Sequence, residues 1–131
     1  MKTDIILCGV GGQGILSIAT IIGEAAMKEN LYIKQAEVHG MSQRGGDVQS
    51  NLRISSSPIQ SDLIPLGTAD VIISMEPMEA LRYLPFLSKT GWIITSSTPF
   101  VNIPLRSNRK SLLVTIPTKQ LFSSTTGIPP M

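Results

Sequence analysis

Cysteine and histidine are nearly absent from this chain of 131 residues, which contains one of each, Cys8 and His39. A single cysteine excludes an internal disulfide. It also excludes a cysteine-ligated iron–sulfur cluster held by this chain alone, because such clusters take several thiolates. One cysteine and one histidine are too few for a typical zinc site, so we predict no bound metal. We expect Cys8, which ends an apolar run, to be a small buried residue at the end of a strand.

Long hydrophobic runs are missing as well. The longest strongly apolar stretch, 15–27, is interrupted by Ser17, Thr20 and Glu24, so it does not predict a membrane span. No basic segment precedes a hydrophobic stretch at the N-terminus, and a secretory signal is therefore not predicted. We expect a cytoplasmic protein that does not interact with membranes.

Acidic residues are absent after Glu79, whereas six of the eleven basic residues follow it. Aromatic residues make up only 5% of the chain and the basic residues are scattered, so the stacking surface of a nucleic-acid-binding protein is not expected. The simplest interpretation is a mildly basic, solvated face. Attraction for an anionic ligand or for an acidic partner subunit is the functional interpretation.

The residues that are present predict one globular domain, since 42% are hydrophobic and 15% are charged. Apolar runs typical of strands lie at 3–8, 31–36, 48–54, 70–75, 91–96 and 111–116, and helical periodicity lies at 15–29 and 77–88. This alternation predicts an α/β fold, a three-layer α/β/α sandwich with a mostly parallel, Rossmann-like sheet. We expect the domain to occupy residues 1–116, followed by an irregular tail at 117–131.

Three details of these elements can also be predicted. Residues 48–54 alternate between apolar and polar side chains, which is typical of a half-exposed strand. Pro85 should kink or shorten the second helix. The first helix carries apolar residues at helical spacing, which should face the sheet. They are Ile15, Ile18, Ala19, Ile22, Ala25 and Ala26.

A glycine-rich turn, Gly9-Val10-Gly11-Gly12-Gln13-Gly14, separates the first strand from the first helix. In such a turn the first glycine permits a tight exit from the strand, the second allows a ligand close to the backbone, and the third lets helix and strand pack closely. Backbone N–H groups at the start of the helix then face an anion, and the Gln13 side chain could donate a further hydrogen bond. A role in packing alone stays open for the same glycines.

A dinucleotide site is one interpretation of this turn. It needs an acidic residue at the end of the second strand, about 20 residues further on, and Glu37 lies in that region. The chain is too short for a second domain that would bind a hydride acceptor. A P-loop is excluded because no Gly-Lys-Ser/Thr follows the turn.

A second glycine-rich stretch, Glu37-Val38-His39-Gly40-Met41-Ser42-Gln43-Arg44-Gly45-Gly46, concentrates hydrogen-bonding side chains. Arg44 can bind a phosphate or carboxylate through two parallel hydrogen bonds, and His39 can titrate near neutral pH or simply fix the loop. A loop at the end of the second strand should lie beside the first glycine turn, where open α/β sheets bind ligands. The alternative is a solvated polar loop.

Together these motifs resemble one family. Residues 9–15 and 37–46, with Val48, Ser50 and Arg53 beyond them, are similar to the gamma subunit or domain of 2-oxoacid:ferredoxin oxidoreductases, and in particular to the beta subunit of indolepyruvate ferredoxin oxidoreductase. Residues 69–80 share this resemblance, which covers roughly residues 3 to 104. The chain is shorter than this family usually runs.

The resemblance implies a non-autonomous subunit. The family decarboxylates a 2-oxoacid such as indolepyruvate, pyruvate or ketoisovalerate, transfers the acyl group to coenzyme A and passes electrons to ferredoxin. Thiamine diphosphate and iron–sulfur clusters would then belong to a partner subunit, while this chain, inactive and without cofactors when alone, would contact coenzyme A or the 2-oxoacid. The residues expected to form this contact are Gly9, Gly11, Gly12, Gln13, Gly14, His39, Ser42, Gln43 and Arg44. Two alternatives stay open: an independent NAD(P)-binding domain and a purely structural interaction subunit.

Overall fold

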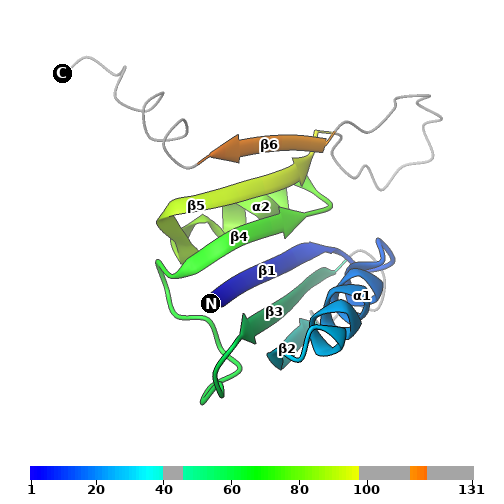
Figure 1. Cartoon of the computed structure of the whole chain (residues 1–131). Coiled ribbons are helices and arrows are strands. Elements are labelled where there is room, and N and C mark those ends of the chain that lie inside the picture. The colour runs from blue at the N-terminus through cyan, green and yellow to red at the C-terminus, as the bar shows by residue number, and fades with distance from the viewer. Residues whose placement is uncertain (40–45, 98–112, 118–131) are drawn as a thin grey trace.

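A computed structural model describes residues 1–39 and 46–97, together with the backbone of 113–117. Within these ranges six strands form one sheet in the order β2-β3-β1-β4-β5-β6 (Figure 1). The strands are β1 (Lys2–Val10), β2 (Tyr32–His39), β3 (Asp47–Ser55), β4 (Ala69–Ser74), β5 (Leu87–Ser96) and β6 (Leu113–Pro117). The helices are α1 (Ile15–Lys28), α2 (Pro77–Arg82) and a short 3-10 helix, η1 (Leu84–Phe86).

One helix packs on each face of the sheet. Along β1, Ile5 and Leu7 pack in the cluster on the α1 side, whereas Ile6 and Cys8 pack in the cluster on the α2 side. This alternation follows from the two-residue period of a strand. Figure 1 shows α1 in front of β2 and β3, and α2 behind β4 and β5. The predicted three-layer α/β/α sandwich is confirmed.

The sheet is mixed, so the prediction of a mostly parallel sheet was wrong. β1 pairs with β4, and β4 with β5, in parallel, but the pairs β1–β3, β2–β3 and β5–β6 are antiparallel. The physical reason lies in the connection between β2 and β3. It is too short for the crossover that parallel neighbours need, so β3 returns antiparallel and lies between β2 and β1.

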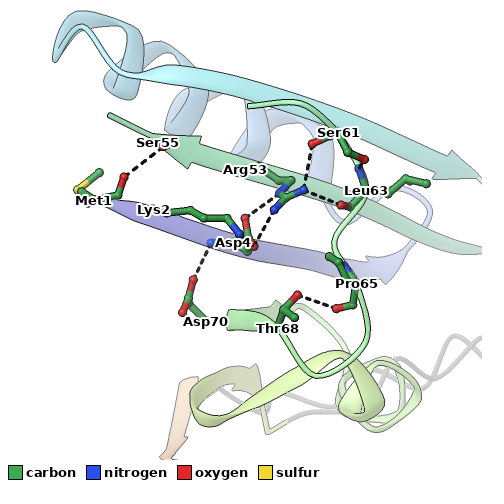
Figure 2. A network of polar contacts seen from close by, with 10 residues as sticks. All are labelled: Met1, Lys2, Asp4, Arg53, Ser55, Ser61, Leu63, Pro65, Thr68 and Asp70. Carbon is green, nitrogen blue, oxygen red and sulfur yellow. Dashed lines mark hydrogen bonds and ion pairs between the residues drawn. The ribbon is translucent and has the colours of Figure 1, made fainter. Parts of the chain in front are cut away.

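The interior position of β3 also overturns the prediction of a half-exposed strand. Every residue from Ser50 to Ser55 is buried. Arg53 lies between strand and loop, where its Nε and Nη2 donate to the two carboxylate oxygens of Asp4 at 2.9 and 3.2 Å (Figure 2). Its Nη1 donates to the carbonyl oxygens of Ser61 and Leu63 at 3.1 and 2.9 Å. The polar side chain of Arg53 is therefore buried, and hydrogen bonds to neighbouring protein groups satisfy it.

The predicted helices and the last strand are present with shifted bounds. In α1 the buried positions include Gly23, and Ala25 is exposed instead of facing the sheet. Pro85 shortens the second helix as predicted, because α2 ends at Arg82 and Pro85 lies in η1. The strand expected at 111–116 is β6, and the tail expected to begin at 117 falls mainly outside the described residues. Among the helices described, none is long and apolar enough to cross a membrane.

Candidate functional site

The glycine turn joins β1 to α1 in a backbone conformation that favours glycine. Gly12 has φ +95° and Gly14 has φ +81°, both in the left-handed region. Gly14 is the N-cap of α1, which has neither a side-chain cap nor an acidic residue in its first turn. Among the described residues, none accepts a hydrogen bond from the N–H groups of Gly12 or Gly14. Within the described part of the chain, the exposed outer side of the turn thus presents N–H donors without an acceptor at the positive end of a helix dipole.

The inner side of the turn is already hydrogen-bonded. The Gln13 side chain accepts from the Val10 N–H at 2.8 Å and donates to the Met75 carbonyl oxygen at 3.4 Å. The Gly11 N–H donates to the carbonyl oxygen of Gly46 at 2.9 Å. The expected donation from Gln13 to a ligand therefore stays a prediction, since the structure shows both ends of its amide bonded within the chain.

The second glycine-rich motif reaches the first turn through β3. Asp47, the first residue of β3, pairs with Val10, the last residue of β1, and Gly46 bonds to Gly11 beside them. The predicted proximity of the two motifs is confirmed at this point. Ser42, Gln43 and Arg44 lie outside the described residues, so their contribution stays a prediction.

Glu37 and His39 lie on β2, at the edge of the described sheet, and β3 separates them from β1. At about 4.8 Å per strand, this puts β2 about 10 Å from β1. The Glu37 carboxylate accepts from the Gln35 side chain at 2.6 Å and lies 3.5 Å from Nε2 of His39. Glu37 is therefore not in the strand next to the glycine turn, where a dinucleotide fold places its ribose-binding acid. The His39 side chain is 54% exposed and remains available to a partner.

Three titratable residues are buried on the α2 side: the predicted burial of Cys8 is confirmed, whereas the burial of Tyr83 and Glu79 was not predicted from the sequence. Burial raises the pKa of the Cys8 thiol and of the Tyr83 hydroxyl, each to about 12. Burial also raises the pKa of Glu79, assisted by the carboxylates of Asp47 and Glu76 and opposed by Arg82, whose Nε lies 3.2 Å away. Cys8 is thus a protonated thiol at neutral pH and not a nucleophile.

The start of α2 explains part of this arrangement. The Glu76 carboxylate accepts from the Glu79 N–H at 3.0 Å, which caps the helix, and Pro77 follows in the first helical position. An acid before proline is a helix-start signal that the sequence did contain. Across the described residues, no group of three or more His, Cys, Asp or Glu side chains is placed to hold a metal ion.

Sequence comparison connects this geometry to known proteins. The family described as pyruvate ferredoxin/flavodoxin oxidoreductase matches residues 4–130. The chain belongs to this family. The resemblance stated above on the two glycine-rich motifs is thereby confirmed, because nearly the whole chain is matched.

Relatives within the family include the indolepyruvate oxidoreductase subunit IorB of Methanothermobacter thermautotrophicus, 45% identical over 105 residues, which cover 79% of this chain and 53% of the relative. The 2-oxoglutarate synthase subunit KorC of Methanothermobacter marburgensis is 30% identical over 95 residues, covering 72% of this chain and 50% of the relative. The chain spans about half the length of these relatives.

Solved structures share the fold. The gamma subunit of a keto/oxoacid ferredoxin oxidoreductase from Geobacter sulfurreducens superposes with a TM-score of 0.60 at 24% identity, over 72% of this chain and 50% of that one. The 2-oxoglutarate:ferredoxin oxidoreductase of Magnetococcus marinus, solved with 2-oxoglutarate, coenzyme A and succinyl-CoA, gives a TM-score of 0.66 at 18% identity, over 80% of this chain and 18% of that one. At these identities the likeness concerns the fold.

Proposed function

We propose that the chain is a non-autonomous part of a 2-oxoacid:ferredoxin oxidoreductase. In that complex it would support oxidative decarboxylation of a 2-oxoacid to an acyl-coenzyme A, with the electrons passed to ferredoxin. The observation that carries the proposal is the family match over residues 4–130, together with relatives named as subunits of indolepyruvate oxidoreductase, 2-oxoglutarate synthase and pyruvate/ketoisovalerate oxidoreductases. Indolepyruvate is the favoured substrate because the IorB relatives are 45 to 46% identical, against 28 to 30% for the other types.

The redox cofactors would be held by a partner subunit. A cysteine-ligated cluster does not fit this chain, whose one thiol, Cys8, is buried with its pKa raised to about 12. We likewise assign thiamine diphosphate to the partner, by the division of labour that the family resemblance implies. This chain would contribute a surface that closes over the partner's active site.

The outer side of the glycine turn is the part of that surface suited to an anion. Gly12 and Gly14 are exposed, and their N–H groups lie next to the uncapped start of α1. A phosphate of coenzyme A or the carboxylate of the 2-oxoacid would be held there. Ser42, Gln43 and Arg44 would complete this cradle or contact the partner subunit, and His39 marks where their loop leaves β2.

Co-expression with the thiamine- and cluster-binding partner tests the proposal. We expect the tagged chain to be purified together with that partner, and the complex to contain iron and thiamine diphosphate. The complex should reduce ferredoxin when a 2-oxoacid and coenzyme A are added, whereas the isolated chain should not. A chain that never forms a complex, under conditions where both proteins are folded, would contradict the proposal. The cytoplasmic location also stays a prediction, which cell fractionation would check.

Arg44→Ala separates a ligand site from a purely structural interface. If Arg44 binds the ligand, the complex should form normally but need a higher concentration of coenzyme A or 2-oxoacid for half-maximal rate. Loss of the complex would instead favour the structural interaction subunit. Lys89→Ala is the control, since Lys89 is an exposed cation in the first half of β5, far along the sheet from the turn.

A further inference from the structure

Gln13 differs from the rest of the glycine turn because its side chain points back into the chain. Its Oε1 lies 2.8 Å from the Val10 nitrogen, and its Nε2 lies 3.4 Å from the carbonyl oxygen of Met75. Val10 ends β1, and Met75, 62 residues from Gln13 in sequence, directly follows β4, so one amide group connects the ends of these two strands. A primary amide is suited to this position because it offers an acceptor and a donor without charge.

The ends of β1 and β4, which Gln13 connects, lie in two of the segments that carry the family resemblance, residues 9–15 and 69–80. The Met75 N–H donates to the carbonyl oxygen of Cys8 at 3.0 Å, which extends the β1–β4 pairing to the turn. Beyond Met75 comes Glu76, the N-cap of α2. On the other side, Gly11 is bonded to Gly46, the residue before β3. The glycine turn is therefore bonded to the residue that follows β4 through the Gln13 side chain and to the end of the second motif through the Gly11 N–H.

The absence of a side chain at position 9 is explained by the same amide. A Cβ placed on Gly9 would lie 2.7 Å from Oε1 of Gln13 and 3.0 Å from Cδ1 of Ile15. Gly9 has no left-handed backbone angle that would require glycine. A side chain at position 9 would therefore displace the Gln13 amide or the end of the Ile15 side chain, which fill the space above Gly9.

We propose that Gln13 is a positioning residue: its amide holds the glycine turn against the β4–α2 junction, so that the N–H groups of Gly12 and Gly14, which have no acceptor among the described residues, face the ligand in a fixed geometry. This inference rests on the proposed function for the identity of that ligand. It differs from the sequence-based expectation, because the side chain acts on the turn and does not contact coenzyme A or the 2-oxoacid. Preorganised donors bind an anion better than donors that must be ordered on binding.

Two substitutions test the role. Gln13→Met keeps the length of the side chain but removes both hydrogen bonds. Gln13→Glu keeps the acceptor for Val10 but places a second oxygen against the Met75 carbonyl. Gln49→Glu is the matched control, since Gln49 lies opposite Cys8 on β3 and its Nε2 bonds only to Asn51 among the described residues. Amide hydrogen exchange is measured on the isolated chain, and the half-saturating concentration of coenzyme A on the complex.

In the isolated chain, we expect Val10 to exchange about tenfold faster in Gln13→Met than in the wild type, as the loss of one hydrogen bond predicts. In the complex, both Gln13 variants should raise the half-saturating coenzyme A concentration by about tenfold, and Gln49→Glu should change neither quantity. An unchanged exchange rate of the Val10 amide in Gln13→Met would overturn the inference. Faster exchange together with an unchanged half-saturating concentration of coenzyme A would overturn it as well. A wild-type complex that does not respond to coenzyme A contradicts the proposed function, whereas the exchange result depends on neither partner nor ligand.

Discussion

At the scale of single residues, Arg53, which is part of the family resemblance, serves the fold by holding a loop. Its guanidinium, 10% exposed, pairs with the buried Asp4 through two hydrogen bonds and holds the loop carbonyls of Ser61 and Leu63 (Figure 2). The same carboxylate lies 3.2 Å from the exposed Lys2. We infer that the Asp4–Arg53 pair fixes the connection from β3 to β4.

Removing one partner of this pair should be far more costly than removing the exposed cation. Arg53→Met leaves the Asp4 carboxylate buried without its main partner, and we expect it to lower the free energy of unfolding by about 3–5 kcal/mol. Lys2→Met should change it by less than about 1 kcal/mol, because exposed ion pairs contribute little. Urea denaturation measures both. Equal effects of the two substitutions would show that the buried pair does not hold the loop.

Cys8 should make the chain less stable in alkali. Burial raises its pKa from 9.0 to about 12, so between these values the unfolded chain has lost the thiol proton while the folded chain retains it. Stability is therefore full below about pH 9 and falls as the pH rises toward about 12. Cys8→Ala should flatten this fall when the free energy of unfolding is measured against pH. Tyr83, also raised to about 12, will leave part of the slope, and Tyr83→Phe should remove that part.

At the scale of elements, two glycines are expected to respond in opposite ways to a methyl group. Gly23 lies inside α1, and a Cβ there would meet no atom within 4 Å, so Gly23→Ala should stabilise the chain by roughly 0.5–1 kcal/mol. A Cβ on Gly91 in β5 would lie 2.9 Å from the backbone oxygen of Ala69, so Gly91→Ala should cost about 1–3 kcal/mol. Thermal denaturation distinguishes the two, and a destabilised Gly23→Ala would contradict the packing described for α1.

Local spacing predicted the elements well, but it could not predict their neighbours. The glycine turn and the Ile15-to-Ala26 periodicity located β1 and α1, because both signals lie within a few residues. Asp4 lies 49 residues from Arg53, and Met75 lies 62 residues from Gln13, so the local pattern of a strand does not contain these partners. The insertion of β3 between β2 and β1 is a long-range pairing of the same kind.

The same distinction applies to the candidate site. Its glycine turn and its contact with the second motif were predictable from the chain order of strand, turn and helix. The burial of Glu79 and Tyr83 was not, because it depends on how α2 packs against β1, β4 and β5. The sequence pattern alone would place Glu79 in solvent, and only the fold brings it near the carboxylates of Asp47 and Glu76.

Across the whole molecule, the two ends of the sheet have different roles. At one end of β1, Asp4, Arg53 and the β3–β4 loop form a bonded structural network. At the other end, the glycine turn, the start of β3 and the start of α2 converge around Gln13 and leave donors exposed. At this end the N–H groups of Gly12 and Gly14 have no acceptor among the described residues, so a ligand or a partner subunit could bind them there.

This whole-molecule arrangement predicts that the chain does not bind NADH. A ribose-binding acid must lie at the end of the strand next to β1, but Glu37 lies on β2, and Glu76, which follows the neighbouring β4, is buried and caps α2. The Glu37 carboxylate is moreover bonded to Gln35 and close to His39. NADH should therefore leave the midpoint of thermal denaturation of the isolated chain unchanged. A bound ligand at a hundred times its Kd would stabilise the fold by about 2.7 kcal/mol, which such an experiment detects. A raised midpoint that Glu37→Gln abolishes would restore the dinucleotide interpretation, and a raised midpoint that persists in Glu37→Gln would place NADH elsewhere on the chain.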